Sequence, residues 1–296
     1  MILSKLVLGG ANFGQTYGID RNKIKLEEIN KILSYLKKKN KKIIIDSSPN
    51  YKNCEKILKN LKYSNFLIIT KIKGLPKRKI EIKKFIENFI YRHKKKTKKN
   101  IYAILLHDEF ELSNIKRLRF IIEILNKIKR QGIIKKYGFS IYNYTKYKKN
   151  ILKMKPDILQ FPLNIVDDRI NKVEFEKLKK KKISLHARSV FLQGLLLKNQ
   201  KYLPKRFKKL RKVWQEYDER CFSSNSNKLE TCLGEVLSNS YINKIVIGFN
   251  SFFQFKEIEK IKKTKKKFIF PNLSKNQKTF LINPYKWKND FSNYTS

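Results

Sequence analysis

The sequence predicts an α/β protein folded as one closed, TIM-type barrel of eight parallel strands. Short apolar runs alternate with amphipathic helical segments along nearly the whole chain of 296 residues. Eight such strand-and-helix units in a single chain of this length favour a closed barrel over an open doubly wound sheet. The chain can also fill the core of a barrel, because 41% of its residues are hydrophobic.

The predicted strands are short runs of β-favouring residues that end in turn-forming or polar residues. They cover residues 6–8, 43–46, 66–71, 101–107, 137–142, 158–164, 183–190 and 244–249. The first strand enters a turn of small residues, 9–14, and the second stops on Asp46 before Pro49 turns the chain toward Tyr51. Active sites of such barrels lie at the C-terminal ends of the strands. We therefore expect Asp46 and Tyr51 to mark the functional face.

Apolar residues recur at helical spacing between these strands. The predicted helical segments cover 26–36, 54–61, 82–90, 118–128, a short stretch after 142, a stretch ending in the lysine run 179–182, and the segments 204–220 and 226–238. We expect residues 1–267 to form the barrel. Residues 268–296, with Pro271, Pro284 and scattered Asn and Lys, are expected to form an irregular tail packed on or extending from it.

The charge of the chain raises the question of a polyanionic partner. Its 70 Lys and Arg residues against 24 Asp and Glu give a formal net charge of +46. The lysines are spread along nearly the whole chain together with abundant Ile and Asn, which indicates a general compositional bias on solvated faces. We expect weak, salt-sensitive binding of polyanions and no specific nucleic-acid partner.

The cysteines and the N-terminus bear on the cellular compartment. Cys54, Cys221 and Cys232 show no CxxC spacing, so the sequence indicates neither a disulfide framework nor a zinc or other metal site. The apolar segment 1–8 is short for a signal sequence and is interrupted by Lys5, and no run approaches the ~18 apolar residues of a membrane span. The sequence predicts a soluble cytoplasmic protein without a membrane partner.

Short motifs occur in order at the ends of successive predicted strands. They are residues 8–14, Asp46-Ser47-Ser48-Pro49-Asn50-Tyr51, Thr70-Lys71, Leu106-His107-Asp108, Gly138-Phe139-Ser140, Gln160, Ala187-Arg188-Ser189 with Gly194-Leu195, Ile247-Gly248, and Gln254. Each match alone is weak, but the ordered set, from about residue 5 to residue 260, resembles the aldo-keto reductase family, in the short form that lacks an N-terminal hairpin. The resemblance implies an oxidoreductase that reduces a small-molecule carbonyl with a nicotinamide dinucleotide.

The residues themselves suit that chemistry. Reduction of a carbonyl needs a hydride on carbon and a proton on oxygen. Tyr51 is the candidate proton donor, and an adjacent Lys71 ammonium would lower the pKa of its phenol from about 10. Asp46 would hold Lys71 charged and in place. His107 would hydrogen-bond the substrate oxygen and orient the carbonyl.

Each of these residues also has a structural interpretation. Asp46 could be a helix cap, Lys71 one more lysine in a lysine-rich chain, and Tyr51 a half-buried core aromatic. His107 is the most telling, since the chain has only three histidines and this one ends an apolar strand. The four together favour catalysis. His186 is interpreted as a barrel or pocket residue, and His93 as a solvated residue at a charged helix end.

The sequence has neither a GxGxxG after a strand nor a Walker motif, which disfavours a Rossmann site or a P-loop. The resemblance implies a dinucleotide across the barrel mouth, with Gly10 among its contacts. Ser140 and Gln160 match positions that bind the carboxamide, while Ile141 replaces an asparagine of many relatives. Arg188 stands where many relatives stack an aromatic on the nicotinamide.

The phosphates are expected at the loop that begins with Gly248, near Asn250 and Gln254 and the N-terminus of the next helix. Lys256 or another nearby lysine would read a 2′-phosphate, which makes NADP(H) more expected than NAD(H). Expected substrate-pocket residues are Asn12, Phe13, Asn50, Phe191 and Leu192, which fit a sugar-like substrate or a small aldehyde without choosing between them.

Two other classes of function compete with an active reductase. One is a reductase-like barrel that binds cofactor and acts as a regulatory subunit without turnover. The other is a nucleic-acid-binding protein, which rests on charge alone. The presence of all four catalytic residue types argues against the regulatory subunit, and a salt titration of polyanion affinity would show nucleic-acid binding to be nonspecific. The sequence does not indicate an oligomeric state.

Overall fold

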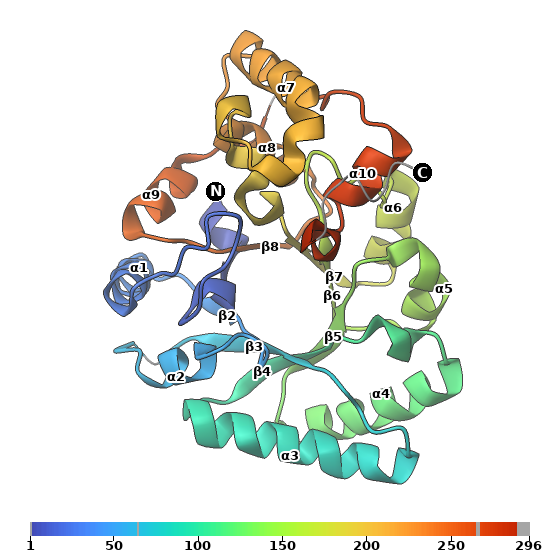
Figure 1. The fold of residues 1–296 in the computed structure, drawn as a ribbon. Helices are drawn as coiled ribbons and strands as arrows, with labels where there is room; N and C mark the ends of the chain where they lie inside the picture. Colours follow the sequence, from blue (N-terminus) through green and yellow to red (C-terminus); the bar gives the residue numbers. More distant parts are fainter. Residues whose placement is uncertain (1, 64, 265–266, 289–296) are drawn as a thin grey trace.

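The computed structural model describes residues 2–63, 65–264 and 267–288, and its eight parallel strands close into a barrel in the order β1 to β8 (Figure 1). Pairing of β1 with β8 closes the ring, with Leu6 opposite Ile245 and Leu8 opposite Ile247. The strands are β1 Leu6–Gly9, β2 Ile44–Asp46, β3 Leu67–Ile72, β4 Ile101–Leu106, β5 Lys136–Ser140, β6 Ile158–Pro162, β7 Ser184–Arg188 and β8 Lys244–Ile247. The predicted fold class is confirmed.

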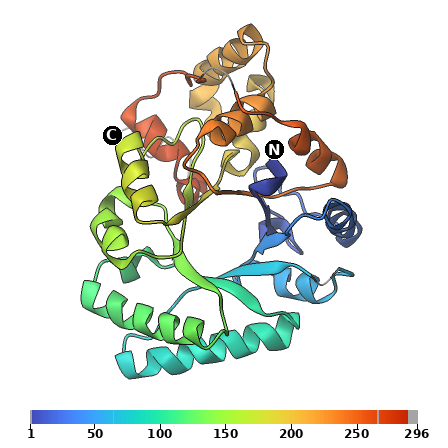
Figure 2. The same cartoon turned by 180° about the vertical axis from the view of Figure 1, so that it is seen from behind.

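Helices surround the barrel on its outer side in both views (Figures 1 and 2). They are α1 Leu26–Lys38, α2 Cys54–Lys59, α3 Lys79–Thr97, α4 Ile115–Arg130, α5 Tyr144–Met154, α6 Lys172–Lys180, α7 Arg211–Ser223, α8 Lys228–Ser238, α9 Phe252–Lys260 and α10 Lys275–Leu281. The amphipathic pattern explains them: α4 begins at the side-chain cap of Asn114 and buries an apolar stripe that includes Leu118 and Leu125.

Two packed layers form the core. One lies between the strands and the helices, and a second, smaller cluster lies inside the barrel and includes Ile44, Ile69 and Leu105. Side chains two residues apart on a strand point the same way. Asp46 therefore follows Ile44, and Lys71 follows Ile69, on the inner face of the barrel. The alternation of the strands thus carries these two polar residues to the C-terminal mouth.

Strand β5 approaches β6 too closely to carry a side chain at Gly138. A Cβ atom there would lie 2.1 Å from the carbonyl oxygen of Ile158, its register partner. The glycine of the Gly138-Phe139-Ser140 motif is therefore required by strand packing. It sets the path of the strand that ends at Ser140.

The structure corrects two sequence expectations outside the barrel mouth. Part of the tail is regular, because residues 275–281 form α10 and a 3₁₀ helix, Pro284–Lys288, follows. Phe280 and Trp287 are buried there, each packed edge-on against Phe207. His93, expected in solvent, is 1% exposed, because α2 packs against α3 and brings Glu55 Oε1 to 3.2 Å from its Nδ1.

None of the helices in the described ranges is long and apolar enough to cross a membrane.

Candidate active site

The structure brings Asp46, Tyr51 and Lys71 together at the C-terminal mouth of the barrel. Lys71 Nζ donates hydrogen bonds to Asp46 Oδ2 at 2.5 Å, to the Ser47 carbonyl at 3.1 Å and to the Tyr51 hydroxyl at 3.4 Å. Lys71 and Asp46 are 2% and 3% exposed, so their ion pair is shielded from water. An ammonium buried this deeply needs such partners to stay charged.

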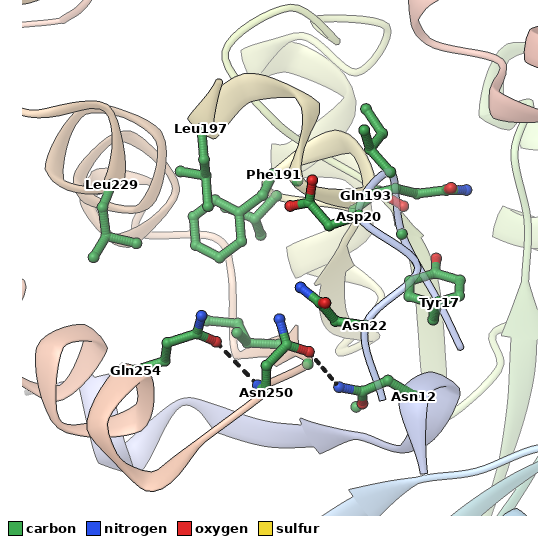
Figure 3. A pocket seen from close by; sticks show the side chains of 18 of the residues that line it. Asn12, Tyr17, Asp20, Asn22, Phe191, Gln193, Leu197, Leu229, Asn250 and Gln254 are labelled. Atoms are coloured by element: carbon green, nitrogen blue, oxygen red, sulfur yellow. Dashed lines mark hydrogen bonds between the residues drawn. The ribbon is translucent and has the colours of Figure 1, made fainter. Parts of the chain in front are cut away.

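His107 follows β4 and lies on the same cavity wall as these three residues. The cavity has a volume of about 1250 Å³ and extends from these four residues between the loops after β1, β7 and β8 to α7, α8 and α9. Figure 3 labels side chains from the loops after β1, β7 and β8 and from α8 and α9 around it. A space this large and long suits a dinucleotide together with a small substrate.

The pKa of Tyr51 differs from the sequence expectation. Burial of the phenol and the Asp46 carboxylate raise its pKa above the ordinary value of 10, while Arg188 lowers it. Lys71 has less influence than expected because Asp46 neutralises its charge at 2.5 Å. Arg188 is therefore the cation that favours a phenolate at this position.

The imidazole of His107 is neutral at physiological pH. Burial, with Lys71 and Arg188 nearby, lowers the pKa of His107 to about 4. Its Nδ1 is buried and has no hydrogen-bond partner among the residues that the structure describes. A neutral ring with a free nitrogen can hydrogen-bond a bound molecule.

Comparison with known proteins decides the family. The model of the Aldo/keto reductase family matches residues 5–240 of the sequence. The chain belongs to the aldo-keto reductase family. Among curated proteins, none matches the sequence.

Solved structures of aldo-keto reductases share the fold. The holo form of an aldo-keto reductase from Bacillus halodurans is 17% identical, with a TM-score of 0.63, and the match covers 94% of this chain and 90% of that one. A Pseudomonas aeruginosa protein assigned to the aldo-keto reductases is 14% identical, with a TM-score of 0.60 and coverage of 86% and 87%. At these identities the likeness shows the barrel and not the substrate.

Four of the predicted cofactor residues of this aldo-keto reductase line the cavity, namely Arg188, Gly248, Asn250 and Gln254. The loop after β8 is held in shape by side chains: Asn12 Nδ2 donates to Asn250 Oδ1 at 3.1 Å, and the Asn250 amide donates to Gln254 Oε1 at 3.0 Å (Figure 3). Asn12 Oδ1 and Arg188 Nε are buried without a partner in the described part of the chain. Such orphaned groups fit a polar ligand, so the site suits a nicotinamide dinucleotide.

Gly10, Ser140 and Gln160 are placed differently from the expectation, since none of the three lines the cavity as the described residues form it. Ser140 Oγ donates to Gln160 Oε1 at 3.0 Å, and Gln160 Nε2 donates to Asp46 Oδ1 at 2.8 Å, both fully inside the protein. A Cβ at Gly10 would lie 2.9 Å from the Asp46 carbonyl oxygen. Ser140 and Gln160 therefore form a chain of hydrogen bonds that holds Asp46, and their contact with a carboxamide stays a prediction.

Two tyrosines of the site escaped the sequence analysis. Tyr17, in the loop after β1, and Tyr142, just after β5, line the cavity. Arg188 lies over the Tyr142 ring, with its Cζ 4.0 Å from the ring centre, and donates to the Ile141 carbonyl at 3.0 Å. Their positions could have revealed them, because Tyr142 is the last residue of a predicted strand and Tyr17 lies in the loop after another.

The described residues contain no group of three or more His, Cys, Asp or Glu side chains arranged to hold a metal ion.

Proposed function

We propose that this family member reduces the carbonyl group of a small molecule to an alcohol with NAD(P)H, and that Tyr51 is the proton donor. The observation that carries the proposal is the linked set Asp46, Lys71 and Tyr51 beside a large cavity, with contacts of 2.5 and 3.4 Å. A proton donor held beside a dinucleotide-sized space is what carbonyl reduction requires.

Burial keeps the phenol of Tyr51 protonated at neutral pH, and the nearby positive charge of Arg188 acts in the opposite direction and favours release of the proton. When bound, the nicotinamide would supply the hydride to the carbonyl carbon. Tyr51 then passes its proton to the carbonyl oxygen, and Lys71 and Arg188 stabilise the phenolate left behind. The neutral ring of His107 donates a hydrogen bond that orients the substrate oxygen.

A second set of contacts keeps this arrangement fixed. Gln160 occupies Asp46 Oδ1 while Lys71 occupies Oδ2, so both carboxylate oxygens have defined partners. Rotation of the Asp46 carboxylate would break both bonds. Buried, fully paired networks of this kind hold catalytic groups in one geometry.

The walls near Tyr51 indicate the kind of substrate. Of the expected pocket residues, Asn12 and Phe191 line the cavity, whereas Phe13 and Leu192 are buried in the core. Tyr17, Tyr142 and Arg188 complete the wall with hydroxyl groups and one cation. Aromatic faces combined with hydroxyl and guanidinium donors favour a sugar-like carbonyl compound or a small polar aldehyde.

We also propose that the protein works in the cytoplasm. Cys54, Cys221 and Cys232 are buried and free, which fits a reducing compartment such as the cytoplasm. We propose a small-molecule partner and no specific nucleic acid.

A screen for NADH and NADPH consumption over aldehydes, ketoses and nucleotide-linked keto sugars tests the proposal. We expect turnover on at least one class, and its loss in Tyr51→Phe. Tight cofactor binding without turnover on any carbonyl would instead support a regulatory subunit. Absence of binding by either dinucleotide would refute the reductase function.

A further inference from the structure

The fold gathers many lysines of the chain at one end of the barrel. All eight strands are parallel, so each connection from a helix to the next strand lies at their N-terminal ends, opposite the candidate active site. The first six of these connections, with the last turn of each helix, contain residues 37–42, 56–62, 94–99, 127–136, 153–157 and 177–182. Together these segments carry 25 basic residues and one acidic residue, Asp157.

The end of the barrel that carries the candidate active site has a different balance of charge. Its first six connections, each from a strand to the first turn of the next helix, contain residues 10–28, 47–55, 73–81, 107–117, 141–146 and 163–174. These segments carry 13 basic and 11 acidic residues. The long segment between β7 and α7 is the exception at this end, because it is basic throughout. A general bias toward lysine would load both sets of six connections alike, so the asymmetry belongs to the fold.

Most of the basic side chains in the lysine-rich connections are free to meet a partner. Among the 25, only Lys96, Lys129 and Lys177 form ion pairs with carboxylates of the described residues, at 3.3, 2.6 and 3.0 Å. Most of the others are exposed to solvent. A surface with so many unpaired cations repels itself, so it gains most from a partner that carries many negative charges.

The positive charge continues into the centre of this end, at the N-terminal mouth of the barrel. Lys42 stands two residues before Ile44, which packs inside the barrel. Lys244 stands two residues before Val246, which packs against the same cluster, so both lysines belong to the inner face. Burial, with Lys42 and Lys136 nearby, lowers the pKa of Lys244. In the described part of the chain no carboxylate forms an ion pair with any of these three lysines.

The shape and composition of this end favour a planar partner over a nucleic acid. Helices α1 to α6, which lead into the six connections, follow one another around the barrel (Figures 1 and 2), so a plane can meet all six connections while a duplex meets only a strip. None of the exposed aromatic side chains in the described ranges lies in these connections, so they offer no stacking platform for single-stranded bases. All 25 basic residues except Arg130 are lysines, which lack the planar fork with which arginine reads bases.

One apolar side chain is exposed among these lysines. Ile133 is 47% exposed in the turn between α4 and β5, where Arg130 and Lys135 flank it. An apolar side chain on a basic surface can enter the boundary between lipid headgroups and acyl chains. This feature suits a lipid surface and has no use on a phosphate backbone.

We propose that this end of the barrel docks on an anionic lipid surface. The docking surface, here called the lysine face, consists of the six lysine-rich connections together with Lys244. The inference goes beyond the proposed function and does not rest on it, and it opposes the sequence expectation of evenly spread lysines and no membrane partner. Docking through the lysine face leaves the cavity with Asp46 and Tyr51 open on the side away from the lipid.

Co-sedimentation with vesicles tests the proposal on the whole chain. We expect binding at about 0.15 M ionic strength to vesicles of phosphatidylcholine with roughly one third phosphatidylglycerol, and little binding to phosphatidylcholine alone. The triple variant Lys38→Gln, Lys95→Gln and Lys180→Gln removes three exposed charges from three connections of the lysine face. Because each lysine near such a surface contributes roughly fivefold, the affinity for anionic vesicles should fall roughly a hundredfold.

The matched control removes the same charge from the other end of the barrel. Lys77→Gln, Lys116→Gln and Lys172→Gln change three exposed lysines of the connections that lead from strands to helices. This variant should keep the affinity for anionic vesicles within roughly threefold of the wild type, because these lysines face away from the lipid. Ile133→Ser should weaken vesicle binding severalfold and leave binding of duplex DNA unchanged.

Equal weakening by the two triple variants would show that the net charge acts from all sides and would refute the lysine face. Tighter binding of duplex DNA or RNA than of anionic vesicles at the same salt would make this end a nucleic-acid surface and overturn the proposal.

NADPH binding by the vesicle-bound protein separates this inference from the proposed function. The affinity for NADPH should equal that of the free protein, and its loss on vesicles alone would place the lipid contact at the barrel mouth and overturn the inference. Absence of NADPH and NADH binding in the free protein as well would refute the reductase function and leave the lysine face standing.

Discussion

Burial of the charged Lys71 side chain costs free energy that its partners must offset. An ammonium with 2% exposure is stable only with a partner, and the Asp46 carboxylate lies 2.5 Å away. Removing one partner of a buried ion pair typically costs about 3–5 kcal/mol, because it leaves the other charge without compensation. Gln160, which accepts a hydrogen bond from Ser140, donates one to Asp46 and so helps to hold the carboxylate beside Lys71. Tyr51 therefore has a firmly held neighbour, on which the proposed proton transfer would depend.

Removal of the Tyr51 hydroxyl should separate catalysis from binding. In Tyr51→Phe the ring remains while the proton donor is lost, so kcat should fall by about two orders of magnitude or more. Cofactor affinity should stay within about twofold of the wild type. Steady-state kinetics and calorimetric titration measure the two quantities. Tyr202→Phe, on a tyrosine that is 62% exposed, is the control, and a Tyr51→Phe enzyme with most of its turnover would exclude the assigned role.

His186 should make the protein less stable in mild acid. Burial, with Lys244 and Lys136 nearby, lowers the pKa of His186 from the ordinary 6.5 to about 3. The unfolded chain therefore binds one more proton than the folded chain between these values, so stability rises with pH across this window and is lost as the pH falls. His107, with a pKa of about 4, acts in the same direction.

His186 should contribute about 1.4 kcal/mol per pH unit to the change of the free energy of unfolding with pH between about pH 6 and pH 5. Most carboxylates titrate below this pH range. His186→Gln should remove this part of the pH dependence and leave that of His107. Urea unfolding at several pH values measures it. An identical slope in the variant would mean that His186 is protonated in the folded protein.

At the scale of elements, the tail is part of the packed structure. α10 and the 3₁₀ helix after it place Phe280 and Trp287 against Phe207, which lies between β7 and α7. The loop after β7 also borders the cavity through residues such as Gly194 and Lys198. We propose that packing of the tail supports the segment that leads from β7 to α7.

Phe280→Ala should destabilise the protein strongly. The side chain is 1% exposed, and truncation of a buried Phe usually costs about 3–5 kcal/mol. Tyr285→Ala, on a tail residue that is 64% exposed, should change stability by no more than about 0.5 kcal/mol. Urea denaturation of both variants gives the comparison, and equal, small effects would show that the tail is only loosely attached.

At the scale of the whole molecule, the net positive charge and the charges that line the cavity differ in sign. The net charge of +46 belongs to the outer faces, whereas the cavity wall that the described residues form carries more carboxylates than basic side chains. A field of this sign attracts any polyanion at long range, but it does not determine which molecule fits the cavity. Weak general attraction and specific cofactor recognition therefore have different salt dependence.

Random-sequence duplex DNA should bind the protein only at low salt. Each phosphate that the protein neutralises should contribute a slope of roughly −0.9 to the plot of log affinity against log salt. At near-physiological salt, NADPH or NADH should raise the thermal unfolding temperature while the duplex gives little protection. Thermal shift measurements over a salt series test this. Tight binding of one particular nucleic-acid sequence at that salt, with no effect of either dinucleotide, would exclude the reductase function.

Much of the architecture and part of the site could be predicted from local sequence. Apolar runs that stop on titratable residues placed Asp46, Lys71 and His107 at strand ends. Eight strand-and-helix units indicated the barrel, because the hydrophobic pattern reflects which parts of an element are buried. The aldo-keto reductase motifs at those ends pointed to the same chemistry.

Tertiary structure decided the features that depend on residues far apart in the chain. Gln160 reaches Asp46 across 114 residues, and Glu28 reaches the Phe252 amide across 224. Such contacts placed Ser140 and Gln160 against Asp46 and made Arg188 a cation that lowers the pKa of Tyr51. Hydrogen bonds and charges act through distance in space, which local patterns of sequence do not contain.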